Sequence, residues 1–189
     1  MEISGINKIG LEMLDNRFTE NLELIQQDFQ KDKENIIKTF ESILNKLFEQ
    51  ASKFQSNSEK GPVAYCFFSF LRSCLLTKSY SFRIDLYDDT FYKDLAETAD
   101  YYTPKFIFKY FDEDTEFFEE NIKIKIPYIT AAEMRSFEEW YVFRYYRITQ
   151  KFFTDTANKI KEASAKAGTK MSEDFKVMFG GYFEQGIVL

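Results

Sequence analysis

Apolar residues recur at helical spacing through most of the amino-terminal third, and this pattern constrains the fold more than any other. The stripe runs from Leu11 to Phe54 in steps of three and four residues, with a polar interruption between Gln30 and Glu34. One α-helix of that length would reach roughly 65 Å, which exceeds the width of a compact domain of this size. The sequence predicts a single domain, residues 1–189, whose long amino-terminal helix (about 11–55) either bends at the interruption or protrudes.

A second long helix is predicted from a local start signal. Thr130 and Glu133 have the spacing of a capping box, in which each side chain bonds a backbone N–H of the other residue. Helical spacing then continues to Gly168, a residue suited to end a helix. Two helices of similar length most simply pack antiparallel along one another, so we predict that arrangement.

The segments outside the long helices predict a buried helix and a small sheet. Residues 62–76 are almost entirely apolar and predict a buried central helix, although their aromatic content leaves a strand open. Alternation near residues 79–87 predicts a strand, and residues 175–189 predict a hairpin that turns at Gly180-Gly181. The predicted fold is α+β and mainly helical: two long antiparallel helices plus a buried central helix, with a small antiparallel sheet.

Aromatic residues are abundant and histidine is absent. Phe, Tyr and Trp make up 19% of the chain, and the helical stripes place most of those that can be assigned on core faces. We therefore interpret the excess as core packing, with Trp140, Tyr146 and the pair Tyr182-Phe183 as exceptions that could face a partner. The absence of imidazole excludes Ser-His-Asp and Cys-His nucleophile systems, and zinc or di-iron sites that need histidine.

Charge and cysteine usage limit the partners and the compartment. The net charge of −6 argues against duplex nucleic acid as a partner. Residues 84–121 hold twelve acids and three bases, and residues 141–170 hold seven bases and two acids, so these segments either neutralise each other or present opposite faces. Cys66 and Cys74 lie in an apolar run and predict buried free thiols. With no apolar run long enough to span a bilayer, we expect a cytoplasmic protein without a membrane partner.

Three aspartates are the candidate metal ligands. Asp85, Asp88 and Asp89 lie at the end of the predicted strand, and Mg²⁺ can be held by carboxylates alone. An Mg²⁺-dependent nuclease or phosphotransfer enzyme is therefore an alternative function. Because aspartates at such a place more often cap a turn, we predict no cofactor, no metal and no catalytic residue.

Aromatic and basic residues interleave in the second long helix and form the candidate partner-binding set: Trp140, Arg144, Tyr146, Arg147 and Lys151. Single-stranded nucleic-acid binding through this segment is a further alternative. The preferred hypothesis is a non-enzymatic protein–protein interaction module, acidic and aromatic-cored, such as an inhibitor or accessory protein. Its partner is another protein or a second copy of the chain, the latter docking through the amino-terminal helix.

Overall fold

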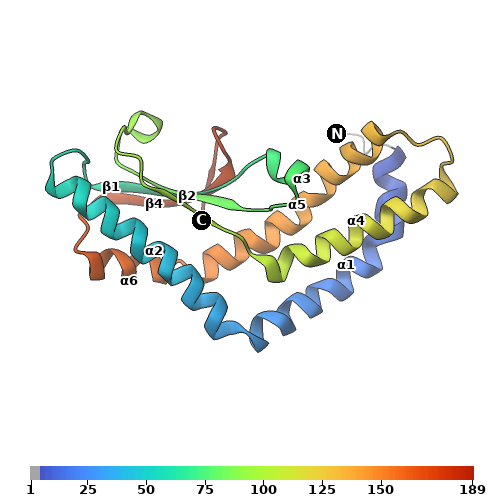
Figure 1. The fold of residues 1–189 in the computed structure, drawn as a ribbon, viewed down its shortest axis with the longest axis horizontal. Helices are drawn as coiled ribbons and strands as arrows, with labels where there is room; N and C mark the ends of the chain where they lie inside the picture. The colour runs from blue at the N-terminus through green and yellow to red at the C-terminus, as the bar shows by residue number, and fades with distance from the viewer. Residues whose placement is uncertain (1–4) are drawn as a thin grey trace. The chain divides into compact units, whose positions relative to one another are not determined.

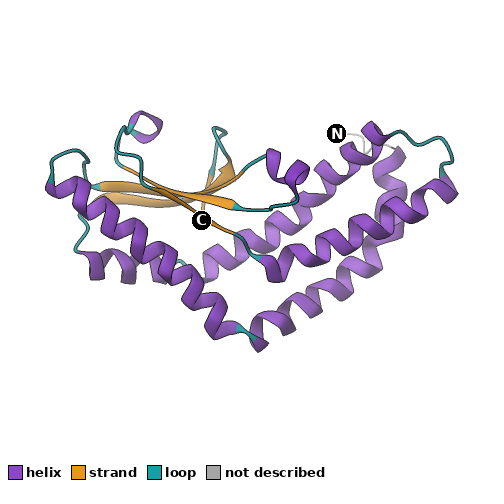
Figure 2. Ribbon diagram, viewed as in Figure 1, coloured by secondary structure: helices purple, strands orange, loops and turns teal. Residues whose placement is uncertain are grey.

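The structure, a computed structural model, describes residues 5–189 and divides them into two compact units. The helical unit comprises residues 5–33 and 105–149, and the sheet unit comprises residues 34–104 and 150–189. Helices and strands alternate irregularly along the chain, and helices predominate, so the predicted mainly helical α+β class is confirmed (Figures 1 and 2). That the chain forms one domain stays a prediction.

The helical unit is a bundle of three helices: α1 (Gly5–Lys31), α4 (Lys105–Lys125) and α5 (Ala131–Asp155) as far as residue 149. Phe29 packs on Phe106 near the start of α4, whereas Arg17 bonds Asp114 further along it, so α1 and α4 run antiparallel. A short loop, residues 126–130, returns the chain into α5 antiparallel to α4. Helices α1 and α5 are therefore parallel, and the prediction that the two long helices pack antiparallel is wrong. The intervening α4 takes the antiparallel position.

A carboxylate buried in the helical unit joins its three helices. Asp114 of α4 is fully buried and accepts hydrogen bonds from the hydroxyls of Tyr141 and Tyr145, both at 2.7 Å. From α1, the side chains of Asn21 and Arg17 each donate to its Oδ1 atom at 3.1 Å. Because buried polar groups are stable only when they are paired, this network allows the three helices one mutual register.

The two tyrosines of this network make the fold sensitive to alkali. Burial raises the pKa of Tyr141 and Tyr145, and the nearby Asp114 charge raises both further. In the unfolded chain each ionises near pH 10, so the free energy of unfolding should fall above that pH by about 1.4 kcal/mol per pH unit and tyrosine. Urea denaturation between pH 8 and pH 11.5 measures this slope. Tyr141→Phe should make it shallower, and an unchanged slope would contradict the assignment.

The sheet unit contains a five-stranded mixed sheet of strand order β3-β2-β1-β4-β5. Its strands are β1 (Val63–Phe70), β2 (Phe82–Tyr87), β3 (Ala99–Tyr102), β4 (Met171–Gly181) and β5 (Ile187–Val188). Central strand β1 pairs antiparallel with β2 and parallel with β4, so the sheet is mixed and not antiparallel as predicted. The predicted strand near residues 79–87 is confirmed as β2, but it pairs with β1 and β3 and not with the carboxyl-terminal segment.

The predicted buried central helix is wrong, because its residues form the central strand. Residues 63–70 are β1, and only Ser73–Thr77 is helical (α3). A strand that is covered on both faces has no polar side and reads as a continuous apolar run, so periodicity cannot separate it from a buried helix. Aromatic residues, which favour strands, were the signal for the correct assignment. Cys66 of this strand and Cys74 of α3 are buried free thiols, as predicted.

Helices cover one face of the sheet, as Figure 1 shows for α2 (Lys33–Ser56) and α6 (Asn158–Ala167). The core between these layers is aromatic: Phe68 of β1 stacks on Phe153 of α5 at 4.1 Å, and Phe40 of α2 contacts both. The predicted interruption of the amino-terminal helix is confirmed at Asp32, between α1 and α2. No helix of residues 5–189 is both long and apolar enough to cross a membrane.

Local end signals of the second long helix are confirmed. Glu133 accepts the backbone N–H of Thr130 at 2.9 Å, and the Thr130 hydroxyl accepts the N–H of Glu133 at 3.2 Å. Gly168 ends α6 in the left-handed conformation, with φ of 64°. Between these ends the helix is interrupted at residues 156–157, where α5 gives way to α6.

The carboxyl-terminal hairpin exists, but its turn is not at the paired glycines. Strand β4 continues through Gly180-Gly181, and residues 182–186 make the turn into β5. A Cβ atom on Gly180 would lie 2.9 Å from the Gly186 backbone, so glycine is required where the returning chain crosses β4. The dipeptide therefore marks a close backbone approach, which sequence alone does not distinguish from a two-residue turn.

Candidate functional site

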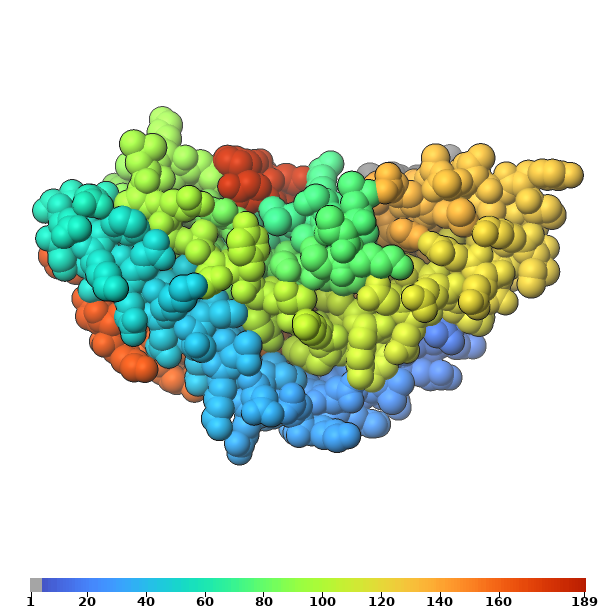
Figure 3. Space-filling view, in the orientation of Figure 1, coloured from blue at the N-terminus to red at the C-terminus, as the bar shows by residue number. Residues whose placement is uncertain are grey.

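The outer face of the sheet, opposite the helices, carries the candidate site. Side chains alternate between the two faces of a strand, so Phe82 points to the helices while Arg83, Asp85 and Tyr87 of β2 point outward. Two loops rise over this outer face: residues 88–98 between β2 and β3, and the carboxyl-terminal turn, residues 182–186. In Figure 3 they lie close together, light green and red.

A pocket of about 250 Å³ lies between these two loops, and we call it the sheet pocket. Its floor is formed by Arg83, Asp85 and Tyr87, and its walls include Tyr92, Leu95 and Glu97 from one loop and Tyr182 and Phe183 from the other. The pocket therefore combines four aromatic rings with ionised side chains, and it lies entirely within the sheet unit.

An ion-pair network forms the floor of the sheet pocket. The Arg83 Nε atom lies 2.9 Å from Oδ1 of Asp85, and its Nη2 atom lies 2.7 Å from Oε1 of Glu97. Asp85 is almost fully buried, and burial raises its pKa although the Arg83 guanidinium opposes that rise. Burial alone would lower the pKa of Arg83, but both carboxylates raise it, so the guanidinium stays charged. One arginine thus faces two carboxylates, which leaves the floor with a net negative charge.

Aromatic rings form the walls. The Tyr92 ring lies 4.8 Å from that of Phe183 and 5.4 Å from that of Tyr87, and Tyr182 contacts Phe183 at 4.4 Å. The Tyr92 hydroxyl is buried, and among the described residues it has no partner at ordinary hydrogen-bond geometry. Burial raises the pKa of Tyr92, and the Phe183 backbone N–H partly opposes that rise. The Tyr92 hydroxyl is therefore shielded from solvent beside the Phe183 backbone.

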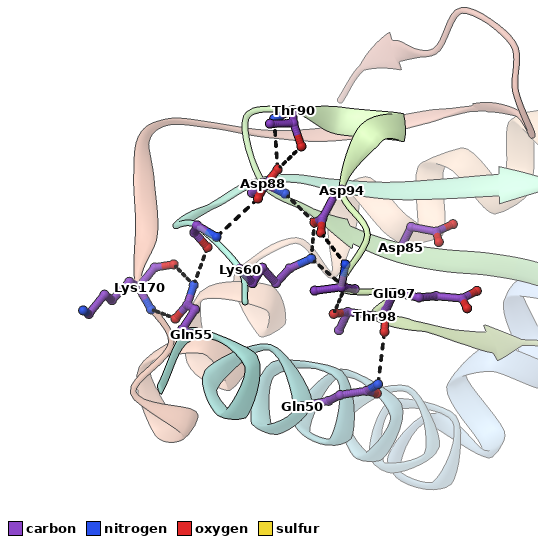
Figure 4. Close-up of polar contacts among 12 residues, drawn as sticks. Gln50, Gln55, Lys60, Asp85, Asp88, Thr90, Asp94, Glu97, Thr98 and Lys170 are labelled. Atoms are coloured by element: carbon purple, nitrogen blue, oxygen red, sulfur yellow. Dashed lines mark hydrogen bonds and ion pairs between the residues drawn. The ribbon is translucent and has the colours of Figure 1, made fainter. Parts of the chain in front are cut away.

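A buried ion pair fastens the 88–98 loop to the sheet. Lys60, just before β1, points toward Asp94 and forms an ion pair with it, and Lys60 also donates to the Ala96 carbonyl at 3.1 Å (Figure 4). Asp94 in turn accepts the backbone N–H groups of Asp88 and Ala96, both at 3.0 Å. The loop that carries Tyr92 and Leu95 is thus held by a buried charge pair and not by apolar packing alone.

Backbone strain occurs in both loops that border the pocket. Phe91 has φ of 55° and Phe183 has φ of 59°, a left-handed conformation that is rare for bulky residues. Such a residue costs of order 1–3 kcal/mol and persists where the surrounding structure or a function requires it. The strain at Phe91 is offset by ring contacts with Tyr65 and Tyr87, at 4.9 and 5.0 Å. Phe183 contacts the rings of Tyr92 and Tyr182, but it is 67% exposed, so burial offsets only part of its strain.

The three candidate metal ligands, Asp85, Asp88 and Asp89, do not share a common site. Asp85 bonds Arg83, whereas Asp88 accepts the N–H and hydroxyl of Thr90 at 2.9 and 2.6 Å. Burial would raise the pKa of Asp88, and these hydrogen bonds bring it below its usual value. Asp89 is exposed. Across residues 5–189, no three His, Cys, Asp or Glu side chains lie together in a way that could hold a metal ion.

The predicted partner-binding residues lie on α5, outside the sheet pocket. Trp140 packs on Phe137, Tyr146 is buried against Phe108, and Arg144 bonds Asp15 at 2.9 Å. Arg147 and Lys151 are exposed, and Lys151 pairs with Asp155 one helical turn later. The structure therefore brings Trp140, Arg144 and Tyr146 into packing contacts of the helical unit. A partner for these five residues stays a prediction.

Sequence reasoning found part of the sheet pocket. Tyr182-Phe183 stood out as aromatics without a core role, and Asp85 as a carboxylate at a strand end. Arg83, Tyr92 and Glu97 were missed. Arg83 and Asp85 are two residues apart in β2 and therefore point to the same face of the sheet. This spacing of opposite charges was a signal in the sequence for the ion pair. Tyr92 and Glu97 belong to the 88–98 loop, and only the folded chain brings them to the site.

Comparison of the chain with protein-family models, with curated proteins and with solved structures finds no match. Inferences about function therefore depend on the chemistry of the sheet pocket and its surroundings.

Proposed function

We propose that the chain is a non-enzymatic interaction module that binds another protein on the outer face of its sheet, around the sheet pocket. The observation that carries the proposal is the pair of exposed apolar side chains at the pocket rim. Leu95 is 97% exposed and Phe183 is 67% exposed, and they come from the two loops that enclose the pocket. Exposed apolar side chains that gather at one place, with aromatic rings beside them, are typical of protein-binding surfaces.

The strained backbone supports the same surface. Phe183 keeps a left-handed conformation although it is 67% exposed, so its burial offsets only part of the cost of that conformation. A residue that costs stability without being buried is expected where the ring contributes to binding. Tyr101, 47% exposed on the outer face of β3, extends the apolar area beyond the pocket.

The charge of the surface favours a basic partner. Arg83 is already paired with Asp85 and Glu97, so the floor offers no free cation to a phosphate group. Nucleic acid, which binds through phosphate contacts to basic side chains, is therefore disfavoured at this site. Asp85 and Asp88 bond groups of the fold itself, which disfavours the Mg²⁺-dependent alternative.

A pair of matched leucine variants tests the proposal. Leu95→Ser removes an apolar side chain from the pocket rim. The control is Leu76→Ser, the same substitution at an α3 leucine that is 60% exposed and does not line the pocket. Both should leave the free energy of unfolding within about 0.5 kcal/mol, because neither leucine is buried. Affinity capture from cells that express the chain, followed by titration of the recovered protein, should show about tenfold weaker binding for Leu95→Ser only.

Phe183→Gly provides a second variant at the rim. It removes the ring and also relieves the left-handed strain, so stability should be kept while binding is lost. A partner that binds both rim variants as tightly as the original chain would refute the proposal. So would the absence of a captured protein together with a concentration-dependent dimer in sedimentation, which would instead favour self-association.

A further inference from the structure

We infer that the sheet pocket receives a cationic side chain, an arginine or a lysine, of the partner protein. The inference rests on the proposed function and names the chemistry that the pocket selects. Four features of the pocket support it: its charge, its rings, its size and the groups left for hydrogen bonding.

The charge of the pocket is negative after internal pairing. Two cations, Arg83 and Lys60, face three carboxylates, Asp85, Asp94 and Glu97. Lys60 and Asp94 form one buried pair, so Arg83 remains to balance Asp85 and Glu97. The uncompensated charge falls on Glu97, whose side chain is 72% exposed and accessible to a ligand. A second cation would complete this network.

The aromatic walls favour the same class of ligand. The faces of Tyr and Phe rings attract cations, and several rings around one site form the cages that bind ammonium and guanidinium groups. Tyr87, Tyr92, Tyr182 and Phe183 line the pocket together. Arg83 already shows this attraction, with its guanidinium carbon 5.2 Å from the centre of the Tyr182 ring.

The size and the free polar groups fit one side chain. A volume of about 250 Å³ lies below the roughly 300–1,000 Å³ of pockets for drug-sized ligands. Both oxygen atoms of the exposed Glu97 carboxylate can accept hydrogen bonds from a ligand in the pocket. Arginine and lysine side chains offer donors only, so they match these acceptors. An anion would instead meet Glu97 and Asp85.

Amino-acid amides test the inference directly on the full chain. The probes are N-acetyl-arginine amide, N-acetyl-lysine amide and N-acetyl-citrulline amide, the last being the neutral counterpart of arginine. Titration is followed through the ring resonances of Tyr87, Tyr92, Tyr182 and Phe183 in ¹³C-labelled protein. We expect saturable shifts of these rings with arginine or lysine amide, and binding about tenfold weaker or undetectable with citrulline amide.

Two glutamate variants make the readout specific. Glu97→Gln should weaken binding of the cationic amides about threefold or more, whereas Glu49→Gln, at an exposed glutamate of α2, should not change it. Equal binding of citrulline amide, shifts confined to other residues, or no shifts would overturn the inference. These outcomes are distinct from failure of the proposed function, because a partner that depends on Leu95 could still bind without using a cation.

Discussion

Replacing Asp114 by alanine is expected to destabilise the helical unit by about 3–5 kcal/mol, the usual cost of removing one member of a buried charged network. The loss arises because four donors, from Arg17, Asn21, Tyr141 and Tyr145, lose their acceptor together. Most domains are stable by only about 5–15 kcal/mol, so this change should be visible as a large shift of the unfolding midpoint.

Neighbouring variants separate the network from the helix that carries it. Glu113→Ala, at the adjacent exposed position of α4, should change the free energy of unfolding by less than about 0.5 kcal/mol. Asp114→Asn keeps one carbonyl acceptor and should retain part of the stability. Urea denaturation followed by circular dichroism at 222 nm measures all three. A loss below about 1 kcal/mol for Asp114→Ala would show that the tyrosine hydroxyls find other partners.

The sequence predicted what is decided locally. Thr130 and Glu133 lie three residues apart, so their capping box is complete within one helical turn and is readable without the rest of the fold. The same holds for Gly168 and for the alternation of β2, whose two faces differ in polarity. These features depend on neighbours in the chain, which a sequence displays directly.

The features that could not be predicted depend on contacts between residues that are far apart in the sequence. Strand β1 is covered by helices on one face and by Phe91 and the carboxyl-terminal turn on the other, so its apolar residues do not alternate with polar ones and their periodicity does not mark it as a strand. The direction of α1 against α5 is set by α4, which packs on both. The sheet pocket likewise draws on β2, on the 88–98 loop and on residues 182–183, and no short-range pattern connects them.

Lys60 should matter to both stability and binding. Lys60→Met leaves the buried Asp94 carboxylate without its ammonium partner, and we expect a loss of about 3–5 kcal/mol from the sheet unit. Asp94 also holds the N–H groups of Asp88 and Ala96, so the 88–98 loop should open and the backbone amides of both residues should exchange faster with solvent.

A double variant distinguishes the effect of leaving Asp94 without its ion-pair partner from the effect of opening the 88–98 loop. In Lys60→Met with Asp94→Asn neither member of this ion pair is charged, and the asparagine carbonyl can still accept one loop N–H, so much of the stability should return. Because Tyr92 and Leu95 are carried by this loop, binding of the partner should weaken in Lys60→Met and recover with stability in the double variant. Denaturation, hydrogen exchange and partner titration on the same three proteins test the link. Stability lost without faster exchange at Asp88 and Ala96 would show that Lys60 supports the sheet but does not hold the loop.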